Sequence, residues 1–96
     1  MTEGNFKKKL KDDIRKLFPG CIITQLDPTY IQGIPDLLIL FKNKWAALEC
    51  KKSPNASKRP NQEYWINIMN DMSYASFISP ESKDKILNEL EHAFKD

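Results

Sequence analysis

The chain is poor in the residues on which disulfides and zinc sites depend. It has two cysteines, Cys21 and Cys50, without a C-x-x-C motif and without the Cys/His spacing of a metal site. We therefore expect two reduced thiols on strands rather than a disulfide or a zinc site. The one histidine, His92, falls on an expected helix near the C-terminus, where an ordinary helix residue is the simpler interpretation.

Long apolar segments are also missing. No apolar run approaches the roughly 20 residues that span a bilayer, and the N-terminal residues MTEGNFKKKL lack the apolar core of a signal peptide. We expect a cytoplasmic protein without a membrane partner. The 96 residues predict one domain, residues 1–96. A chain this short buries only about two thirds of its surface, which favours dimerisation.

Charge is unevenly distributed, although the net charge is only +2. Residues 1–60 hold twelve Lys/Arg against six Asp/Glu, whereas residues 61–96 hold three against seven. One group of cations lies on the first expected helix and includes Lys8 and Lys9. A second group contains Lys52, Lys58 and Arg59. The groups form either a phosphate-binding surface around the central hairpin or a solvated helix face and a polar loop.

Apolar periodicity and turn residues predict the elements of the chain. Thr2, Asn61 and Ser79 are the expected helix caps, and Asn43 is the expected left-handed residue of a tight turn. The pattern predicts a helix over residues 2–18, strands over 21–26, 36–41 and 45–50, a helix after 61, a strand over 74–78 and a helix from 79.

The central hairpin, residues 33–52, carries three ionisable groups beside two apolar runs. Its first arm is a continuous apolar run after Asp36, which is typical of a strand covered on both faces. Side chains alternate along a strand, so Glu49 and Lys51 point to the same face, about 7 Å apart. Asp36, near the open end of the hairpin, is placed to meet them. The alternative is that Glu49 and Lys51 form a plain surface ion pair on an edge strand.

The order of elements and two short motifs together resemble a nuclease superfamily. The chain contains Pro35-Asp36, a gap of twelve residues, and then Glu49-Cys50-Lys51 at the end of a strand. In the order α-β-β-β-α-β-α this arrangement resembles the PD-(D/E)xK superfamily. The fuller pattern GIPD, ECK and a later glutamine at a helix start looks like its VRR-NUC group. The resemblance implies an α/β, restriction-endonuclease-like core with a central mixed sheet flanked by helices.

The resemblance also implies roles for individual residues. Asp36 and Glu49 would be the metal carboxylates, and the backbone carbonyl of Cys50 would be a further oxygen ligand. Lys51 would lie near the attacking water, and Gln62 would line the site from a helix. Mg²⁺ or Mn²⁺ suits such oxygen ligands, and the cation neutralises a phosphodiester and acidifies a water for its hydrolysis. Lys51 would orient that water or stabilise developing negative charge.

Glu3 would match the acidic residue that the first helix often supplies in this superfamily. Phe6, Leu10 and Ile14 follow helical spacing, and the same series extended backward places Glu3 on the inward face. A carboxylate in the first turn is equally explained by the helix dipole. Glu3 is therefore either a catalytic and metal-site residue or a favourable charge at a helix end.

These implications predict a divalent-metal-dependent DNA endonuclease. Short stand-alone members of the group resemble phage-type enzymes that cut branched DNA as homodimers. We therefore expect structured DNA, such as a Holliday junction, as substrate, and the host cytoplasm as location if a phage encodes the chain. A flap endonuclease or a general structure-selective endonuclease is the nearest alternative. The alternatives from other classes are a non-catalytic nucleic-acid-binding module with the same fold and a protein-interaction domain.

Overall fold

The chain follows the expected order of helices and strands. Our computed structural model describes residues 2–95. Over these residues the elements are α1 (Glu3–Leu17), β1 (Ile22–Gln25), β2 (Leu37–Phe41), β3 (Lys44–Cys50), α2 (Pro60–Met72), β4 (Tyr74–Ile78) and α3 (Lys83–Ala93). None of the helices described here is both long and apolar enough to cross a membrane.

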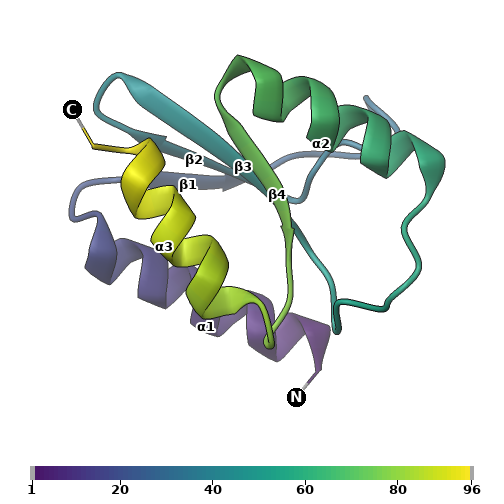
Figure 1. The fold of residues 1–96 in the computed structure, drawn as a ribbon, viewed down its shortest axis with the longest axis horizontal. Helices are drawn as coiled ribbons and strands as arrows, with labels where there is room; N and C mark the ends of the chain where they lie inside the picture. The colour runs from purple at the N-terminus through teal and green to yellow at the C-terminus, as the bar shows by residue number, and fades with distance from the viewer. Residues whose placement is uncertain (1, 96) are drawn as a thin grey trace.

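The four strands form one mixed sheet in the order β1-β2-β3-β4. β1 pairs with β2 and β2 with β3 in antiparallel fashion, whereas β4 is parallel to β3. Parallel neighbours need a crossover connection, which α2 provides. Figure 1 shows α1 and α3 on one face of the sheet and α2 on the other. The architecture is thus α/β, with helices on both sides of a four-stranded sheet.

The hairpin turn differs by one residue from the sequence prediction. Phe41 pairs with Lys44, so two residues, Lys42 and Asn43, form the connection. The left-handed backbone falls on Lys42, with φ 57°, and not on Asn43. A two-residue hairpin loop with positive φ at its first central position matches the right-handed twist of the flanking strands. The pairing register, rather than the turn propensity of asparagine, decides which residue takes this conformation.

One of the three predicted helix caps is confirmed. Thr2 caps α1, and its side chain accepts a hydrogen bond from the N–H of Asn5 at 3.1 Å. The predicted cap at Asn61 is wrong, because Pro60 is the first residue of α2 and Arg59 takes the N-cap position. Proline suits the first helical position, where its fixed φ fits and its missing N–H has no helical partner.

The predicted start of the last helix at Ser79 is also wrong. Residues 80–82 form a turn, and α3 begins at Lys83 with Ser82 in the N-cap position. Ser79 and Ser82 bond to each other reciprocally: the Ser79 N–H donates to Ser82 Oγ at 2.9 Å, and the Ser82 N–H donates to Ser79 Oγ at 3.3 Å. Ser79 thus makes a cap-type bond to a single tight turn, which the Ser82 N–H closes on the Ser79 carbonyl at 3.1 Å, and the α-helix proper starts only after this turn.

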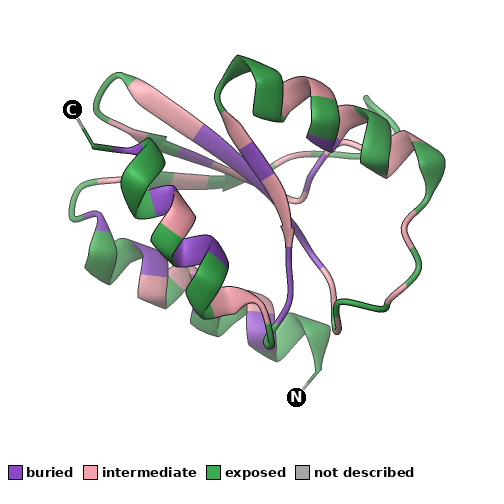
Figure 2. Cartoon of the chain, viewed as in Figure 1, coloured by how far each residue is buried: buried purple, intermediate pink, exposed green. Residues whose placement is uncertain are grey.

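The main core lies between the sheet and the α1/α3 layer. Figure 2 shows buried residues along the central strands and on the inward sides of α1 and α3. The buried cluster is Phe6, Leu10, Ile14, Phe18, Leu37, Ile39, Ala46, Leu48, Cys50, Ile78, Ile86, Leu87, Leu90 and Phe94. This cluster fixes the directions of β2 and β3, and therefore the position of the residues at their ends.

The other face of the sheet is covered only in part. α2 packs over β3 and β4, where Ile66 meets Ala47 and Ala75 in a second, smaller cluster. The α2 side of β1 and β2 stays at the surface: Leu40 is 38% exposed and its cross-strand neighbour Ile22 is 61% exposed. The prediction that residues 36–41 form a strand covered on both faces is therefore wrong for this face.

Candidate active site

The register of the hairpin brings the two predicted metal carboxylates together. Leu37 pairs with Leu48, so Asp36 and Glu49, one position further along, face each other at the open end. The Asp36 N–H donates to Glu49 Oε1 at 3.2 Å. In return, the Cys50 N–H donates to Asp36 Oδ2 at 3.1 Å. Each carboxylate thus accepts from the partner strand's backbone, and both are held in fixed positions.

Lys51 and Gln62 complete a connected polar group around Glu49. Lys51 Nζ lies 3.9 Å from Glu49 Oε2 and donates to Gln62 Oε1 at 2.9 Å. Gln62 Nε2 donates to the same Glu49 oxygen at 3.3 Å, and the Arg59 N–H donates to Gln62 Oε1 at 3.1 Å. With both ends of its amide engaged, Gln62 has one orientation, and it holds Lys51 beside the carboxylate.

These side chains share one cleft with a volume of about 430 Å³. The cleft is formed by the start of α1, the 28–36 loop, the end of β3 and the start of α2. Its lining residues are Glu3, Pro28, Gln32, Gly33, Ile34, Asp36, Glu49, Lys51, Ser57, Arg59, Asn61 and Gln62. The segments that the sequence analysis linked by motif alone therefore meet in space.

Glu3 lines the cleft but is not close to the carboxylate pair. Its side chain is exposed. The direction expected from the helix phase therefore brings Glu3 to the rim of the cleft and not into its interior. Among residues 2–95, no three His, Cys, Asp or Glu side chains are grouped closely enough to hold a metal ion. The carboxylates that lie close together in the cleft are those of Asp36 and Glu49.

Cys50 contributes to this site through its backbone. Its side chain is fully buried in the main core, and burial raises the pKa of the thiol to about 12. A neutral thiol on the opposite face of the sheet is no ligand. The N–H and C=O of one strand residue point to the same side. The Cys50 N–H faces Asp36, so its carbonyl oxygen faces the same edge.

This set of donors fits a hard divalent cation. Mg²⁺ is commonly bound by one or two carboxylates while it keeps several waters. Asp36 and Glu49 supply two carboxylates, and the carbonyl of Cys50 supplies a neutral oxygen. Oδ1 of Asp36 accepts no hydrogen bond from the residues that the structure describes, which leaves it available. These three residues would hold Mg²⁺ or Mn²⁺.

Lys7 is a residue of the site that the sequence analysis missed. Its Nζ lies 3.7 Å from Asp36 Oδ2. Lys7 is four residues after Glu3 on α1, so the two share a helix face. The helical periodicity that predicts Glu3 on the cleft side of α1 also predicts Lys7 there. Gln32, Ser57 and Asn61 also line the cleft, but no motif or periodicity in their segments indicates this.

The environment of Glu49 disfavours its charged form. Its side chain is only 8% exposed. Burial, and secondly the negative charge of Asp36, raise the pKa of Glu49 to about 7, although the cation of Lys51 acts in the opposite direction. A carboxylate with its pKa raised in this way is typical of a functional site, and a bound cation would stabilise its ionised form.

The protein without metal is therefore expected to lose stability as the pH rises through 7. The folded-state pKa of Glu49 lies above its ordinary value of 4.5. The folded protein thus holds an extra proton between these values, so stability falls across this interval and the whole contribution is lost once the proton has left near pH 7. Thermal unfolding in EDTA between pH 5 and pH 8 measures this slope. Glu49→Gln should remove this contribution, whereas Glu63→Gln, at an exposed carboxylate of α2, should keep it. Equal slopes in wild type and Glu49→Gln would contradict the raised pKa.

The cations predicted to bind nucleic acid fall into two groups. Lys8, Lys52 and Arg59 are exposed, and Arg59 lines the cleft. Lys9 Nζ lies 3.9 Å from Asp13 Oδ1 within α1. Lys58 is also engaged within the protein, as described next.

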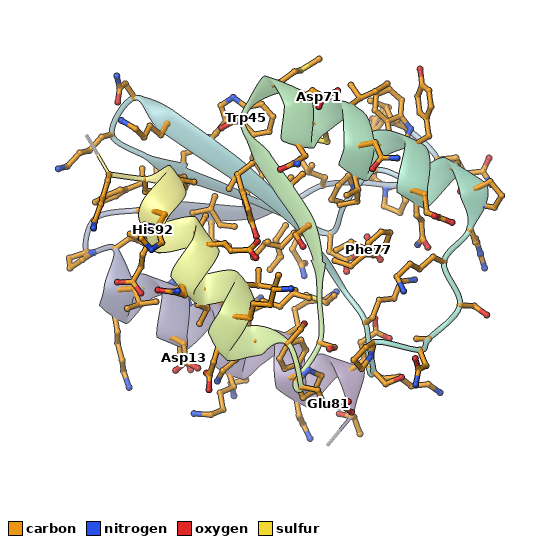
Figure 3. All side chains as sticks on the ribbon, in the orientation of Figure 1. Asp13, Trp45, Asp71, Phe77, Glu81 and His92 are labelled. Carbon is orange, nitrogen blue, oxygen red and sulfur yellow. The ribbon has the colours of Figure 1, made fainter. Side chains whose placement is uncertain are left out.

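Lys58 stabilises the loop between β3 and α2. Its Nζ donates to the carbonyl of Pro54 at 3.0 Å and lies 5.3 Å from the centre of the Phe77 ring. Figure 3 shows Phe77 on the side of β4 that faces this loop. A cation over an aromatic ring is attracted by its negative face. Lys58 thus connects the loop of residues 51–59 to the sheet. Arg59 is therefore the better candidate for a phosphate contact.

Comparison of the chain with protein-family models, curated proteins and solved structures gives no match.

Proposed function

We propose that the protein is a divalent-metal-dependent endodeoxyribonuclease of the PD-(D/E)xK superfamily, in its VRR-NUC group, with a restriction-endonuclease-like core. The observation that carries the proposal is the grouping of Asp36, Glu49, Lys51 and Gln62 in one cleft at the end of the hairpin. A plain surface ion pair would not explain a buried Glu49 opposite a second carboxylate.

Each residue of the group has a separate task in phosphodiester hydrolysis. A bound Mg²⁺ or Mn²⁺ would neutralise the phosphate and lower the pKa of a water. Asp36 and Glu49 would hold the cation at the open end of the hairpin. Lys51 directs a positive charge into the cleft, where it stabilises negative charge that develops on the phosphate or orients the attacking water. Gln62 keeps Lys51 in place.

The proposed substrate is DNA that is recognised by its shape. Contacts to phosphates position a protein on DNA, whereas sequence is read at base edges. Exposed Lys8, Lys52 and Arg59 offer phosphate contacts from α1 and from the loop before α2. Over residues 2–95 all three helices pack against the sheet (Figure 1), so none of these described elements stands apart to enter a groove. Branched DNA, such as a four-way junction, is therefore the substrate class we propose.

Cleavage of labelled DNA tests the proposal directly. A four-way junction, a flap and a linear duplex are incubated with the protein in Mg²⁺ or Mn²⁺. We expect cleavage that requires the metal, is strongest on a branched substrate and is lost in Lys51→Ala. Binding of all three substrates without cleavage in either metal would overturn the enzyme proposal in favour of a non-catalytic binding module. Absence of binding would overturn the choice of DNA as ligand.

Arg59→Gln is expected to weaken DNA binding more than Lys58→Gln. Removal of one cation that touches a phosphate reduces the slope of log affinity against log salt by about 1. Arg59 is exposed beside the cleft, whereas the Nζ of Lys58 is bonded to Pro54. Fluorescence anisotropy of a labelled junction at several salt concentrations measures both slopes. A larger change in slope for Lys58→Gln would show that the loop cation, and not Arg59, contacts phosphate.

A further inference from the structure

Lys7 brings a second lysine to the candidate active site. It lies on the second turn of α1, whereas Asp36 comes directly before β2. Lys7 Nζ is 3.7 Å from Asp36 Oδ2, and both side chains are partly buried. Neither the Pro35-Asp36 motif nor the Glu49-Cys50-Lys51 motif includes this residue. The contact joins the first helix to the carboxylate at the open end of the hairpin, and no role assigned above explains it.

Each carboxylate of the pair has its own ammonium group. Lys51 Nζ lies 3.9 Å from Glu49 Oε2. Lys7 Nζ takes the corresponding position beside Asp36. When both carboxylates are ionised, the two lysines balance their negative charges. A divalent cation held by the carboxylates would therefore enter a site that is already neutral, and both ammonium groups would oppose it.

The two lysines are held in different ways. Lys51 donates a hydrogen bond to Gln62 Oε1 at 2.9 Å, which fixes its position. The side chain of Lys7 has no hydrogen-bond partner among residues 2–95, and its contact with Asp36 is longer than a hydrogen bond. A lysine carries a compact charge on a flexible four-carbon stem. The ammonium group of Lys7 can therefore leave Asp36 at the cost of one ion pair.

A DNA phosphate would offer Lys7 a second partner. A phosphate that reaches a cation held by Asp36 must come close to this carboxylate, and thus within reach of Lys7 Nζ. Lys8, the next residue of α1, is exposed and adds positive charge at this end of the helix, which attracts a phosphate. Contacts between lysine and phosphate are charge-assisted and strong.

We propose that Lys7 exchanges partners: it pairs with Asp36 in the protein without DNA and with a phosphate in the complex. While Lys7 pairs with Asp36, it lowers the affinity of the site for a divalent cation. Once a phosphate holds Lys7, this opposition is reduced and the site takes up the cation more tightly. Such coupling is reciprocal, so the cation also strengthens DNA binding. The inference rests on the proposed nuclease function and adds a control of metal binding to it.

Binding of Mn²⁺ without DNA tests the effect of Lys7 on the cation. The signal of free Mn²⁺ in electron paramagnetic resonance, recorded at pH 8, gives the affinity. Lys7→Gln should bind Mn²⁺ about tenfold more tightly than the wild type, because one of two opposing charges is removed. Lys7→Met is the substitute if circular dichroism shows that Lys7→Gln is unfolded. A purely structural role for Lys7 predicts weaker binding instead, because Asp36 would lose a contact that positions it.

Two control variants separate the position of the charge from its presence. Lys7→Arg keeps the charge beside Asp36 and should bind Mn²⁺ no more tightly than the wild type. Lys8→Gln removes the same charge at the neighbouring exposed position and should change the affinity much less. An unchanged or weaker affinity in Lys7→Gln, an equal gain in Lys8→Gln, or no Mn²⁺ binding by either the wild type or Lys7→Gln would each overturn the proposal.

A second titration with a four-way junction tests the exchange of partners. Both proteins carry Lys51→Ala so that the DNA stays intact, and one of them also carries Lys7→Gln. The junction should tighten Mn²⁺ binding by a larger factor when Lys7 is present. Equal factors would overturn the exchange. Cleavage by the protein with Lys51 intact is measured separately: metal and junction binding as expected here but without cleavage would contradict the nuclease function and leave the exchange standing.

Discussion

Asp36→Asn is expected to lower the rate of metal-dependent DNA cleavage by about 10³-fold, equivalent to about 4 kcal/mol of transition-state stabilisation. The replacement is nearly isosteric, and its amide oxygen still accepts from the Cys50 N–H that Asp36 Oδ2 now holds at 3.1 Å. The hairpin end should therefore stay intact while the negative charge is removed. Single-turnover cleavage of a labelled junction in Mg²⁺ measures the effect.

The control for this variant is Asp13→Asn. Asp13 and Asp36 are similarly accessible, with side chains 22% and 29% exposed, and each lies beside a lysine. Asp13 pairs with Lys83 of α3 and does not line the cleft, so its replacement should leave cleavage unchanged. Junction binding in EDTA should change little in Asp36→Asn. If Asp36→Asn cleaves at the wild-type rate, Asp36 is not part of the catalytic group. A thermal unfolding curve of Asp36→Asn shows whether the variant is folded.

Gly33→Ala is expected to destabilise the protein by about 2–5 kcal/mol. Gly33 has φ 88°, a left-handed conformation that costs an L-residue roughly 1–2 kcal/mol. An added Cβ would also lie 2.7 Å from Cγ and 2.8 Å from the backbone carbon of Asn61. Overpacking of this kind costs about 1–3 kcal/mol. The Tm measured by circular dichroism should fall by roughly 10 °C or more.

Variants of the other two glycines distinguish the cost of backbone strain from the cost of steric overlap with Asn61. Gly20 has the same φ of 88° with no atom within 4 Å of an added Cβ, so Gly20→Ala should show the cost of strain alone. Gly4 lies in α1 with free space around it, and Gly4→Ala should stabilise the protein by about 0.5–1 kcal/mol. If Gly33→Ala loses no more stability than Gly20→Ala, then Asn61 moves away from the added Cβ at little cost.

The same glycine variant is expected to reduce cleavage. Gly33 precedes the Pro35-Asp36 segment, and Asn61 precedes Gln62, so the contact between them joins the two halves of the cleft. Pushing these segments apart would move Gln62 away from Glu49. Cleavage by Gly33→Ala should therefore fall even at temperatures where the variant is folded, whereas Gly20→Ala should cleave at the wild-type rate.

Local signals predict most of this fold. The order of the elements, the hairpin and the cap at Thr2 depend on apolar periodicity and turn residues that lie close together in the chain. The meeting of Asp36 and Glu49 also follows from the sequence, because a short turn fixes the hairpin register. The error at Asn61 arose because Pro60 occupies the first helical position, and the error at Ser79 arose because Ser82, three residues later, takes the N-cap position instead.

The uncovered sheet face could not be predicted in the same way. α2 settles over β3 and β4 because Ala47 and Ala75 are small enough to let Ile66 approach. That choice depends on which strands become neighbours, and the parallel pairing of β4 with β3 joins segments distant in sequence. The apolar run of β2 is compatible with one covered face or two. The position of Lys58 over the ring of Phe77 also depends on the pairing of β4 with β3.

The pairing of Asp36 and Glu49 at the open end of the hairpin affects how the motif would persist in descendants of this chain. Asp36 both accepts the Cys50 amide and donates its own amide to Glu49, so the acidic pair also completes the backbone pairing of the sheet. A lineage that abandoned catalysis would still be under selection to keep hydrogen-bond acceptors at both positions. The side chain of Lys51 bonds to Gln62 and takes no part in the pairing of the strands, so in such a lineage the lysine should be replaced first, and its loss would be the earlier mark of a chain that no longer cuts.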